Sequence, residues 1–218
     1  MRELALGSGD LNVLCVGAHP DDIEIGCGAT LLMLAKSRPA RFTHLIMTGT
    51  AARHAEAEHA AGLFDTGHVI AYAFPDGRLP AHWGDVKSTL DGVAATIDPP
   101  DLVLAPRVDD AHQDHRLLGR LVSTTWRDSL VLHYEIPKWD GDFGPVSTYV
   151  QIPEDVARLK TTYLHTAYPS QHGRDWWDDE LFLSVMRLRG MECRTRYAEA
   201  FVVRKSVLAL TPELWPEG

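Results

Sequence analysis

The chain has 218 residues, of which 45% are hydrophobic and 23% are charged. This is the composition of an ordinary globular protein, and the length suits one domain with a sizeable core. The formal net charge of −9 argues against nucleic acid or an anionic membrane as a general partner. No apolar run approaches the roughly 20 residues of a membrane-spanning helix. The start of the chain, MRELALGSGD, lacks the apolar core of a signal peptide, so we expect a cytoplasmic protein.

Apolar runs that are typical of buried strands alternate with helix-like stretches along the first two thirds of the chain. The strand-like runs are Leu11–Val16, Thr43–Thr48, His68–Ala73, Leu102–Ala105 and Leu130–Ile136. The helix-like stretches are Thr30–Lys36, Arg53–Phe64, Asp85–Ile97 and Leu117–Trp126. This alternation predicts right-handed βαβ crossovers. We therefore expect an α/β fold with a mainly parallel, doubly wound sheet and helices on both of its faces.

The last third of the chain changes character. A helix opening at Pro153-Glu154, a second helix at Asp178–Leu188 and an added strand at Tyr197–Val203 are expected there. Two loops between these elements, Ile136–Gly144 and Tyr168–Trp177, mix aromatic and acidic residues, as loops that cover a site often do. The sequence has no internal repeat, low-complexity tract or linker, so we predict a single domain over residues 1–218.

Two clusters of acids and histidines each follow a strand-like run. The first holds His19, Asp21 and Asp22, and the second spans Asp109–His115. Either one alone is compatible with a helix cap or a turn. In a doubly wound sheet, however, ligands bind beyond the carboxyl ends of the strands, where the first and fourth strands are commonly neighbours. We therefore expect the two clusters to meet, and their residue types are ordinary ligands of a divalent metal such as zinc.

Two other interpretations of the first cluster are disfavoured. Gly26-Cys27-Gly28 follows a strand, but no third glycine completes a dinucleotide-binding motif, and acids occupy the turn where a phosphate would lie. Cys27 as a nucleophile would leave the surplus of carboxylates unexplained. The three cysteines have no metal-type spacing, and we expect them to be reduced thiols.

The paired motifs Ala18-His19-Pro20-Asp21-Asp22 and His112-Gln113-Asp114-His115 resemble those of the PIG-L (LmbE-like) family of zinc-dependent N-deacetylases. Weaker matches extend the resemblance along most of the chain, at Arg53–Glu56, Pro75–Leu79, Ser170-Gln171 and Arg196–Phe201. One departure is that Ile23 separates the second Asp from Glu24, whereas many members have Glu directly after that Asp. We therefore assign no metal role to Glu24.

The resemblance implies a Rossmann-like fold and hydrolysis of an N-acetyl group, most often on a glucosamine unit. It assigns one zinc ion to three ligands, His19, Asp22 and His115. It assigns roles in the chemistry to three more residues, namely Asp21 as the general base, His112 as a cationic partner of the oxyanion, and Asp114 as the carboxylate that holds His112.

Elementary chemistry agrees with this assignment, because three protein ligands leave an open position, as a catalytic zinc requires. Ferrous iron would accept the same ligands. Spacing alone does not separate His112 from His115 as the ligand, and the choice of His115 rests on the resemblance. Asp109 or Asp110 is either a helix cap or a second carboxylate that orients the cluster.

The substrate implied by the resemblance is a small N-acetylated sugar or a glycoconjugate. Candidate contacts to it are Arg53, Asp76, Tyr134 and Trp139. A metal-dependent phosphoesterase and a non-catalytic sugar-binding module are the rival functions, the first because acid–histidine clusters also build two-metal sites. A homo-oligomer is compatible with the sequence, which does not decide the oligomeric state.

Overall fold

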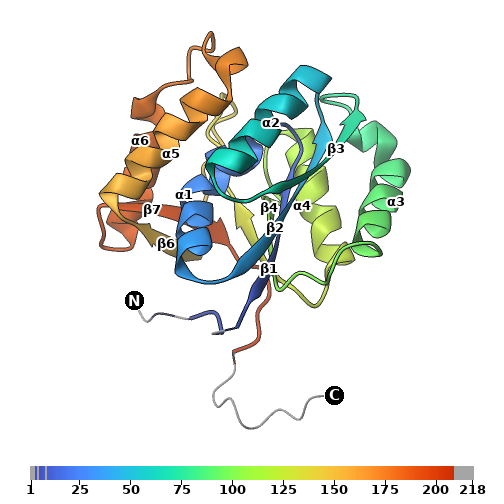
Figure 1. The fold of residues 1–218 in the computed structure, drawn as a ribbon, viewed down its shortest axis with the longest axis horizontal. Helices are drawn as coiled ribbons and strands as arrows, with labels where there is room; N and C mark the ends of the chain where they lie inside the picture. The colour runs from blue at the N-terminus through green and yellow to red at the C-terminus, as the bar shows by residue number, and fades with distance from the viewer. Residues whose placement is uncertain (1–2, 4, 8, 209–218) are drawn as a thin grey trace.

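The computed structural model describes residues 3, 5–7 and 9–208, and the outermost parts of the predicted domain 1–218 lie outside these residues. The described part is one α/β unit (Figure 1). Its strands are β1 (Leu11–Gly17), β2 (Ala40–Thr48), β3 (His68–Phe74), β4 (Leu102–Pro106), β5 (Leu130–Tyr134), β6 (Thr148–Ile152) and β7 (Tyr197–Val202). Its α-helices are α1 (Asp22–Ser37), α2 (Ala51–Leu63), α3 (Trp83–Ala94), α4 (Gln113–Thr125), α5 (Glu154–Ala167) and α6 (Asp179–Glu192). Short 3₁₀ turns lie at Leu79–His82 and Pro169–Gln171.

The strands form one sheet in the order β3-β2-β1-β4-β5-β7-β6. The first five strands are mutually parallel, whereas β7 is antiparallel to both β5 and β6. The predicted Rossmann-like, mainly parallel sheet is thus confirmed. The expected adjacency of the first and fourth strands is also confirmed, because β1 pairs with β4. The strand order reverses between them, which places the loops after β1 and β4 side by side.

Helices cover both faces of the sheet, as predicted, and alternate residues of β1 contribute to separate cores. Val13 and Cys15 belong to the core on the face of α1, α2, α5 and α6. Leu14 and Val16 belong to the core on the face of α3 and α4. This division follows from the two-residue period of a strand. Because β1 is buried from both faces, the loop that follows it starts from a rigid base.

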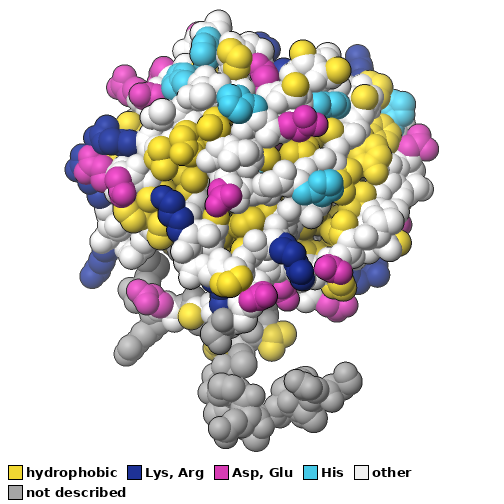
Figure 2. Space-filling model, viewed as in Figure 1, with side chains coloured by type: hydrophobic (Ala, Val, Ile, Leu, Met, Phe, Trp, Pro, Cys, Tyr) yellow, Lys and Arg dark blue, Asp and Glu magenta, His cyan; other side chains and the backbone are white. Residues whose placement is uncertain are grey.

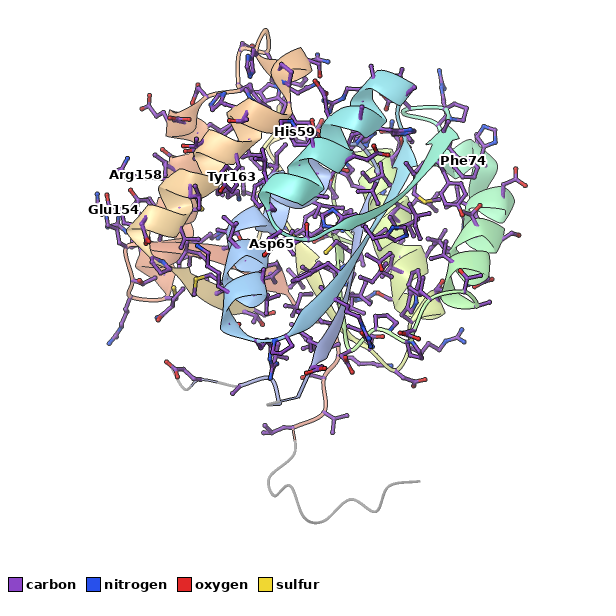
Figure 3. The ribbon with its side chains drawn as sticks, viewed as in Figure 1. His59, Asp65, Phe74, Glu154, Arg158 and Tyr163 are labelled. Atoms are coloured by element: carbon purple, nitrogen blue, oxygen red, sulfur yellow. The ribbon has the colours of Figure 1, made fainter. Side chains whose placement is uncertain are left out.

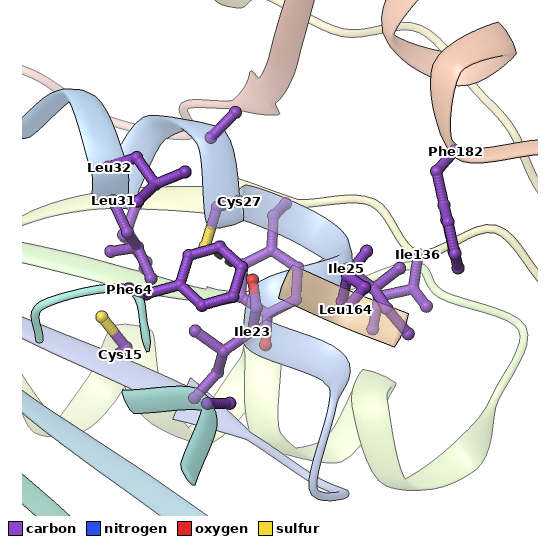
Figure 4. Packing of buried hydrophobic residues seen from close by; sticks show 14 of the residues in the cluster. Cys15, Ile23, Ile25, Cys27, Leu31, Leu32, Phe64, Ile136, Leu164 and Phe182 are labelled. Carbon is purple, nitrogen blue, oxygen red and sulfur yellow. Dashed lines mark hydrogen bonds between the residues drawn. The ribbon is translucent and has the colours of Figure 1, made fainter. Parts of the chain in front are cut away.

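The structure extends several of the expected elements, among them α4, which begins at Gln113, and α6, which runs to Glu192, and it adds one. Helix α1 begins at Asp22 and not at Thr30, and it contains a break at Cys27, whose φ of −144° and ψ of 19° are non-helical. Figure 4 shows Cys27 on this helix with Phe64 beside it. Strand β2 begins at Ala40, before the expected Thr43, and the sequence analysis did not predict the edge strand β6.

Charged side chains are spread over the outer surface, as Glu154 and Arg158 on α5 illustrate (Figure 3). Tyr163 lies on the opposite, inward side of α5, with its ring centroid 5.4 Å from that of Phe64. On the face drawn in Figure 2, histidines gather in the upper half, among acidic and apolar side chains. None of the helices within the described part of the chain is long and apolar enough to cross a membrane.

Candidate metal centre and active site

The loop between β1 and α1 carries the first cluster. Its backbone conformation and backbone hydrogen bonds determine where the carboxylates of Asp21 and Asp22 lie. Asp21 has a φ of 119°, a left-handed conformation that is uncommon outside glycine and costs conformational energy. Asp21 occupies the N-cap position of α1, yet its side chain makes no capping hydrogen bond. The Asp22 carboxylate instead accepts hydrogen bonds from the backbone N–H groups of Ala18 and His19, both at 2.9 Å. The side chains of Asp21 and Asp22 therefore do not act as a simple cap of α1.

Three side-chain atoms from the two clusters converge in the structure. His19 Nδ1 lies 3.1 Å from His115 Nε2, His115 Nε2 lies 3.2 Å from Asp22 Oδ2, and His19 Nδ1 lies 3.4 Å from Asp22 Oδ2. Ligands bound tetrahedrally to zinc at 2.0–2.2 Å are separated by about 3.3–3.6 Å. The three atoms are thus spaced almost as the corners of one face of a zinc coordination tetrahedron. These residues fit a zinc ion.

Other groupings share His19. The nitrogens of His19, His112 and His115 lie within 4.8 Å of one another, and so do ligand atoms of His19, Asp76 and Asp114. In the second grouping His19 uses its other nitrogen, because Nε2 lies 3.0 Å from Asp76 and 3.5 Å from Asp114. A histidine that binds a metal through Nδ1 keeps its proton on Nε2. The carboxylates of Asp76 and Asp114 are therefore placed to accept a hydrogen bond from the Nε2–H of His19. This is the usual way in which a metal-binding histidine is oriented.

Asp114 therefore has different neighbours from those that the resemblance implied. Its carboxylate accepts hydrogen bonds from the backbone N–H groups of Gly77 and Leu79, at 2.7 and 3.0 Å, and faces His19. The described contacts of His112 with Asp114 involve the backbone N–H of Asp114 and not its carboxylate. The expected Asp114–His112 side-chain pair is thus replaced by an Asp114–His19 pair. Asp114 also ties the metal site to the Pro75–Leu79 turn.

The electrostatics of the site favour bound positive charge. Burial opposes the charged form of His19, but the carboxylates of Asp22, Asp114 and Asp76 outweigh it and raise the pKa of His19 to about 12. Burial is likewise outweighed at His115, where Asp22 and Asp110 raise the pKa to about 9. Despite its own burial, the pKa of Asp22 is lowered by the two neighbouring imidazoles. A cluster that retains protons this strongly is also suited to a divalent cation.

Asp21 lies beside this cluster in a different environment. Burial raises the pKa of its carboxyl group to about 7, although the positive charge of Arg53 acts in the opposite direction. Arg53 donates to Asp21 Oδ2 at 2.6 Å and also to the carbonyl of Pro20. The other guanidinium nitrogen binds Glu56 and Ser170, so Arg53 is held from both sides. A carboxyl group whose pKa is near 7 suits a general base.

His112 occupies the N-cap of α4, where its Nδ1 accepts a hydrogen bond from the Asp114 N–H at 3.3 Å. A ring nitrogen that accepts a hydrogen bond carries no proton, so the ring proton is on Nε2. Burial, together with the nearby charges of His115 and His19, lowers the pKa of His112. These surroundings favour a neutral ring that donates from Nε2, whereas the resemblance implied a cation.

The sequence left two roles open for Asp109 or Asp110. Asp109 pairs with Arg107, whereas Asp110 has features of both roles. The Oδ1 of Asp110 accepts from the His112 N–H at 2.8 Å, which closes the turn before α4. Its Oδ2 lies 3.3 Å from His115 Nδ1, on the side of the ring opposite Asp22. Lys138, which the sequence analysis did not single out, pairs with Asp110 at 2.9 Å. The loop after β5 therefore reaches the site through Lys138.

The predicted substrate contacts fall into different environments. Tyr134 is fully buried, and its hydroxyl donates to the Val16 carbonyl at 2.6 Å. It packs against α1 and is not placed to contact a substrate, which departs from the prediction. Trp139 is 67% exposed, and the Asp76 side chain is 77% exposed beside His19. These two residues, with Arg53, remain predicted contacts at the rim of the site.

Comparisons with known proteins agree with this geometry. The family model described as "PIG-L: GlcNAc-PI de-N-acetylase" matches residues 14–126, just over half of the chain and both clusters. The "uncharacterized deacetylase YaiS" of Escherichia coli K12 is 29% identical over 163 residues, which cover 70% of this chain and 88% of that protein.

Two solved structures share the fold. The conserved protein TT1542 from Thermus thermophilus is 26% identical with a TM-score of 0.72, covering 95% of this chain and 100% of that one. The N,N'-diacetylchitobiose deacetylase from Pyrococcus horikoshii is 22% identical with a TM-score of 0.68, covering 88% and 83%. From the family match and the site that it spans, we conclude that the chain belongs to the PIG-L family of N-deacetylases and is an amidohydrolase.

Proposed function

We propose that the protein uses one zinc ion to remove the acetyl group from an N-acetylamino sugar, such as a glycoside of N-acetylglucosamine, or from a related small metabolite. The observation that carries the proposal is the convergence of His19, Asp22 and His115 at 3.1–3.4 Å, with Asp21 beside them. The Pyrococcus relative is by its name a deacetylase of an acetylated disaccharide, which supports a sugar substrate here.

In this proposal His19, Asp22 and His115 hold the metal, and Asp114 and Asp110 orient the two histidines. A bound zinc ion would polarise the amide carbonyl and lower the pKa of a water molecule in the site. Asp21 accepts a proton from the attacking water and returns it to the departing amine. Arg53 keeps the Asp21 carboxylate in place. His112 donates a hydrogen bond from Nε2 to the carbonyl oxygen as negative charge develops there.

The substrate-facing residues follow from exposure and position. Asp76 lies at the rim next to His19, where its carboxylate is able to accept hydrogen bonds from sugar hydroxyls. Trp139 is the more exposed of the aromatic residues Trp139 and Phe143 in the loop that Lys138 anchors, and its ring suits the apolar face of a sugar. Arg53 already has acceptors within the chain, so its primary role in the proposal is to hold Asp21.

A screen for acetate release tests the proposal. The purified protein is incubated with N-acetylglucosamine glycosides and N-acetylated amino metabolites, in parallel with the Asp21→Asn variant. We expect zinc-dependent release of acetate from at least one acetylated sugar, and strongly reduced release by the variant. Release of phosphate from phosphoesters without release of acetate would contradict the proposal, and so would equal activity of the two proteins.

A further inference from the structure

Helix α1 is interrupted one turn after the metal-binding region, and other elements supply partners for the interrupted backbone. In a continuous α-helix the N–H of Ala29 would bond to the carbonyl of Ile25. Here the Ile25 carbonyl accepts from Lys160 Nζ at 2.6 Å. The N–H groups of Ala29 and Thr30 donate instead to the two carboxylate oxygens of Glu199, at 3.0 and 2.6 Å. Two side chains thus replace the helix's own hydrogen bonds at the break.

These two side chains also form a buried ion pair. Lys160 Nζ lies 2.6 Å from Glu199 Oε1, and the side chains are only 4% and 2% exposed. Lys160 comes from α5 and Glu199 from the middle of β7. A buried ion pair is seldom the most stable filling for a core, because desolvation of the charges offsets their attraction. Apolar side chains would fill the same space, but they would leave the polar groups of the broken helix without partners, which is costly.

The segment between this break and the start of α1 carries one proposed metal ligand, Asp22, and directly follows the proposed base, Asp21. It spans Asp22–Gly26, which is little more than one helical turn, and all of its residues are buried. The N–H of Ile25 donates to the carbonyl of Asp21 at 2.9 Å. Ile25 is therefore bonded to Lys160 through its carbonyl and to Asp21 through its N–H. A change in direction at the break would therefore reach the two carboxylates through this turn, of which Ile25 is a part.

We propose that Lys160 and Glu199 are positioning residues of the deacetylase: by replacing the helical hydrogen bonds at the break, they set the direction in which the first turn of α1 presents Asp21 and Asp22. This inference rests on the roles proposed above for Asp21 and Asp22. It adds two residues that contact neither the metal ligands nor the rim of the site. Their effect is transmitted through the backbone of α1.

The variant Glu199→Gln tests the proposal, because a glutamine offers one acceptor oxygen where three donors now converge. Glu135→Gln is the matched control, since Glu135 forms a similarly buried pair with Arg189 on α6 and lines the same cavity as Lys160 and Glu199. Its described side-chain hydrogen bonds go to Arg189 and not to the backbone of α1. We expect Glu199→Gln to lower kcat by about 10–100-fold, the usual scale for residues that orient a site, with KM changed less than about threefold. We also expect its cobalt-substituted form to show an altered visible spectrum. Glu135→Gln should retain the wild-type kcat and spectrum.

A second readout needs neither metal nor substrate. Amide exchange of Ala29 and Thr30 in the metal-free protein is expected to be slow in the wild type and in Glu135→Gln, and at least about tenfold faster in Glu199→Gln. Lys160→Met provides a second variant if Glu199→Gln does not fold, and the wild-type exchange rates remain a test in any case. Rapid exchange of both amides in the wild type would overturn the proposal.

The double variant Lys160→Glu with Glu199→Lys distinguishes two explanations. In one, only the attraction between the two charges matters; in the other, each side chain must match the polar backbone groups of α1 that it contacts. The double variant keeps opposite charges together but turns a cation toward N–H groups and a carboxylate toward a carbonyl. We expect it not to restore kcat. Restored kcat in this double variant, or a Glu199→Gln protein with lowered Tm but unchanged kcat and spectrum, would show that the pair serves stability alone. Wild-type protein without any deacetylase activity would instead contradict the proposed function, and amide exchange would still test the role of the pair.

Discussion

Asp21 and Asp22 are adjacent in the chain, yet the structure gives their carboxylates opposite surroundings. Asp22 faces the imidazoles of His19 and His115, which lower its pKa. Burial raises the pKa of Asp21 to about 7, although the positive charges of Arg53 and His19 act in the opposite direction. Asp21 has a left-handed backbone conformation, and its carboxylate pairs with Arg53, whereas that of Asp22 faces His115. Neighbouring carboxylates with separated pKa values are a common basis for dividing catalytic roles.

The first prediction compares Asp21→Asn with Asp22→Asn. Asparagine tolerates the positive φ at position 21 better than alanine does, so the backbone should be retained. Asp21→Asn should keep its zinc while kcat falls by about 10²–10⁴-fold, the usual contribution of a general base. Asp22→Asn should lose zinc. Zinc content measured beside kcat checks this, and the reverse pattern would exchange the two roles.

The second prediction concerns the two histidines that spacing alone does not separate. His115 Nε2 is within 3.2 Å of both partner ligand atoms, whereas His112 accepts a backbone hydrogen bond through Nδ1. His112→Ala should therefore retain zinc and lose about 10²–10³ in kcat, as when one oxyanion donor is removed. His115→Ala should lose zinc. Metal analysis of both variants decides the matter, since loss of zinc from His112→Ala alone would reverse the assignment.

At the scale of elements, the site depends on how α1 meets the sheet. Gly26 faces the ring of Tyr134, and a Cβ at this position would lie 2.2 Å from Tyr134 Cδ2. Tyr134 has little freedom to move, because its hydroxyl is bonded to Val16 in β1. The close approach of helix and strand therefore requires glycine at position 26.

The third prediction is a pair of glycine substitutions with opposite effects. Gly26→Ala should lower the free energy of unfolding by about 1–3 kcal/mol or more, because the added methyl group overpacks the core. Gly92→Ala on α3 meets no atom within 4 Å and should raise it by about 0.4–1 kcal/mol, because alanine loses less backbone entropy on folding. Urea denaturation measures both. Equal effects of the two substitutions would contradict the packing described here.

Most elements were predictable because their hydrophobic patterns are local. The alternation of strand-like and helix-like stretches indicated the parallel sheet, and the adjacency of β1 and β4 followed from common topology. The first turns of α1 were not predicted because two glycines and several acids interrupt the apolar pattern there. Lys160 had a detectable sequence signal, since it lies four residues from both Val156 and Leu164 on the buried face of α5. The Asp114–His19 pair had none, because it depends on the three-dimensional placement of the Pro75–Leu79 turn.

On the scale of the whole molecule, the metal site joins segments that are distant in the chain. His19 and Asp22 follow β1, His115 lies in the first turn of α4 after β4, and Asp76 lies in the turn after β3. A cation bound only by the folded arrangement stabilises the fold as a whole. In the metal-free protein, protons on His19 and His115 offset part of the negative charge instead.

The fourth prediction is that metal-free protein loses stability as the pH rises. Folding raises the pKa of His115 from 6.5 to about 9 and that of His19 to about 12. Their stabilising effect is therefore complete below about pH 6.5 and is lost as the pH rises through the folded values. Zinc binding displaces these protons, so the Tm difference between zinc-loaded and metal-free protein should increase from about pH 6.5 to about pH 9. A Tm difference that is constant over this range would contradict the prediction.

The most direct test of the central claim is the position and number of metal ions in a crystal of the zinc-loaded protein. An anomalous difference map at the zinc edge should show one peak per chain, at about 2.0–2.2 Å from His19 Nδ1, Asp22 Oδ2 and His115 Nε2, the usual bond lengths for zinc. A single peak between Asp76 and Asp114 would contradict the assigned ligands. Two adjacent peaks in the wild-type site would contradict the single-metal mechanism.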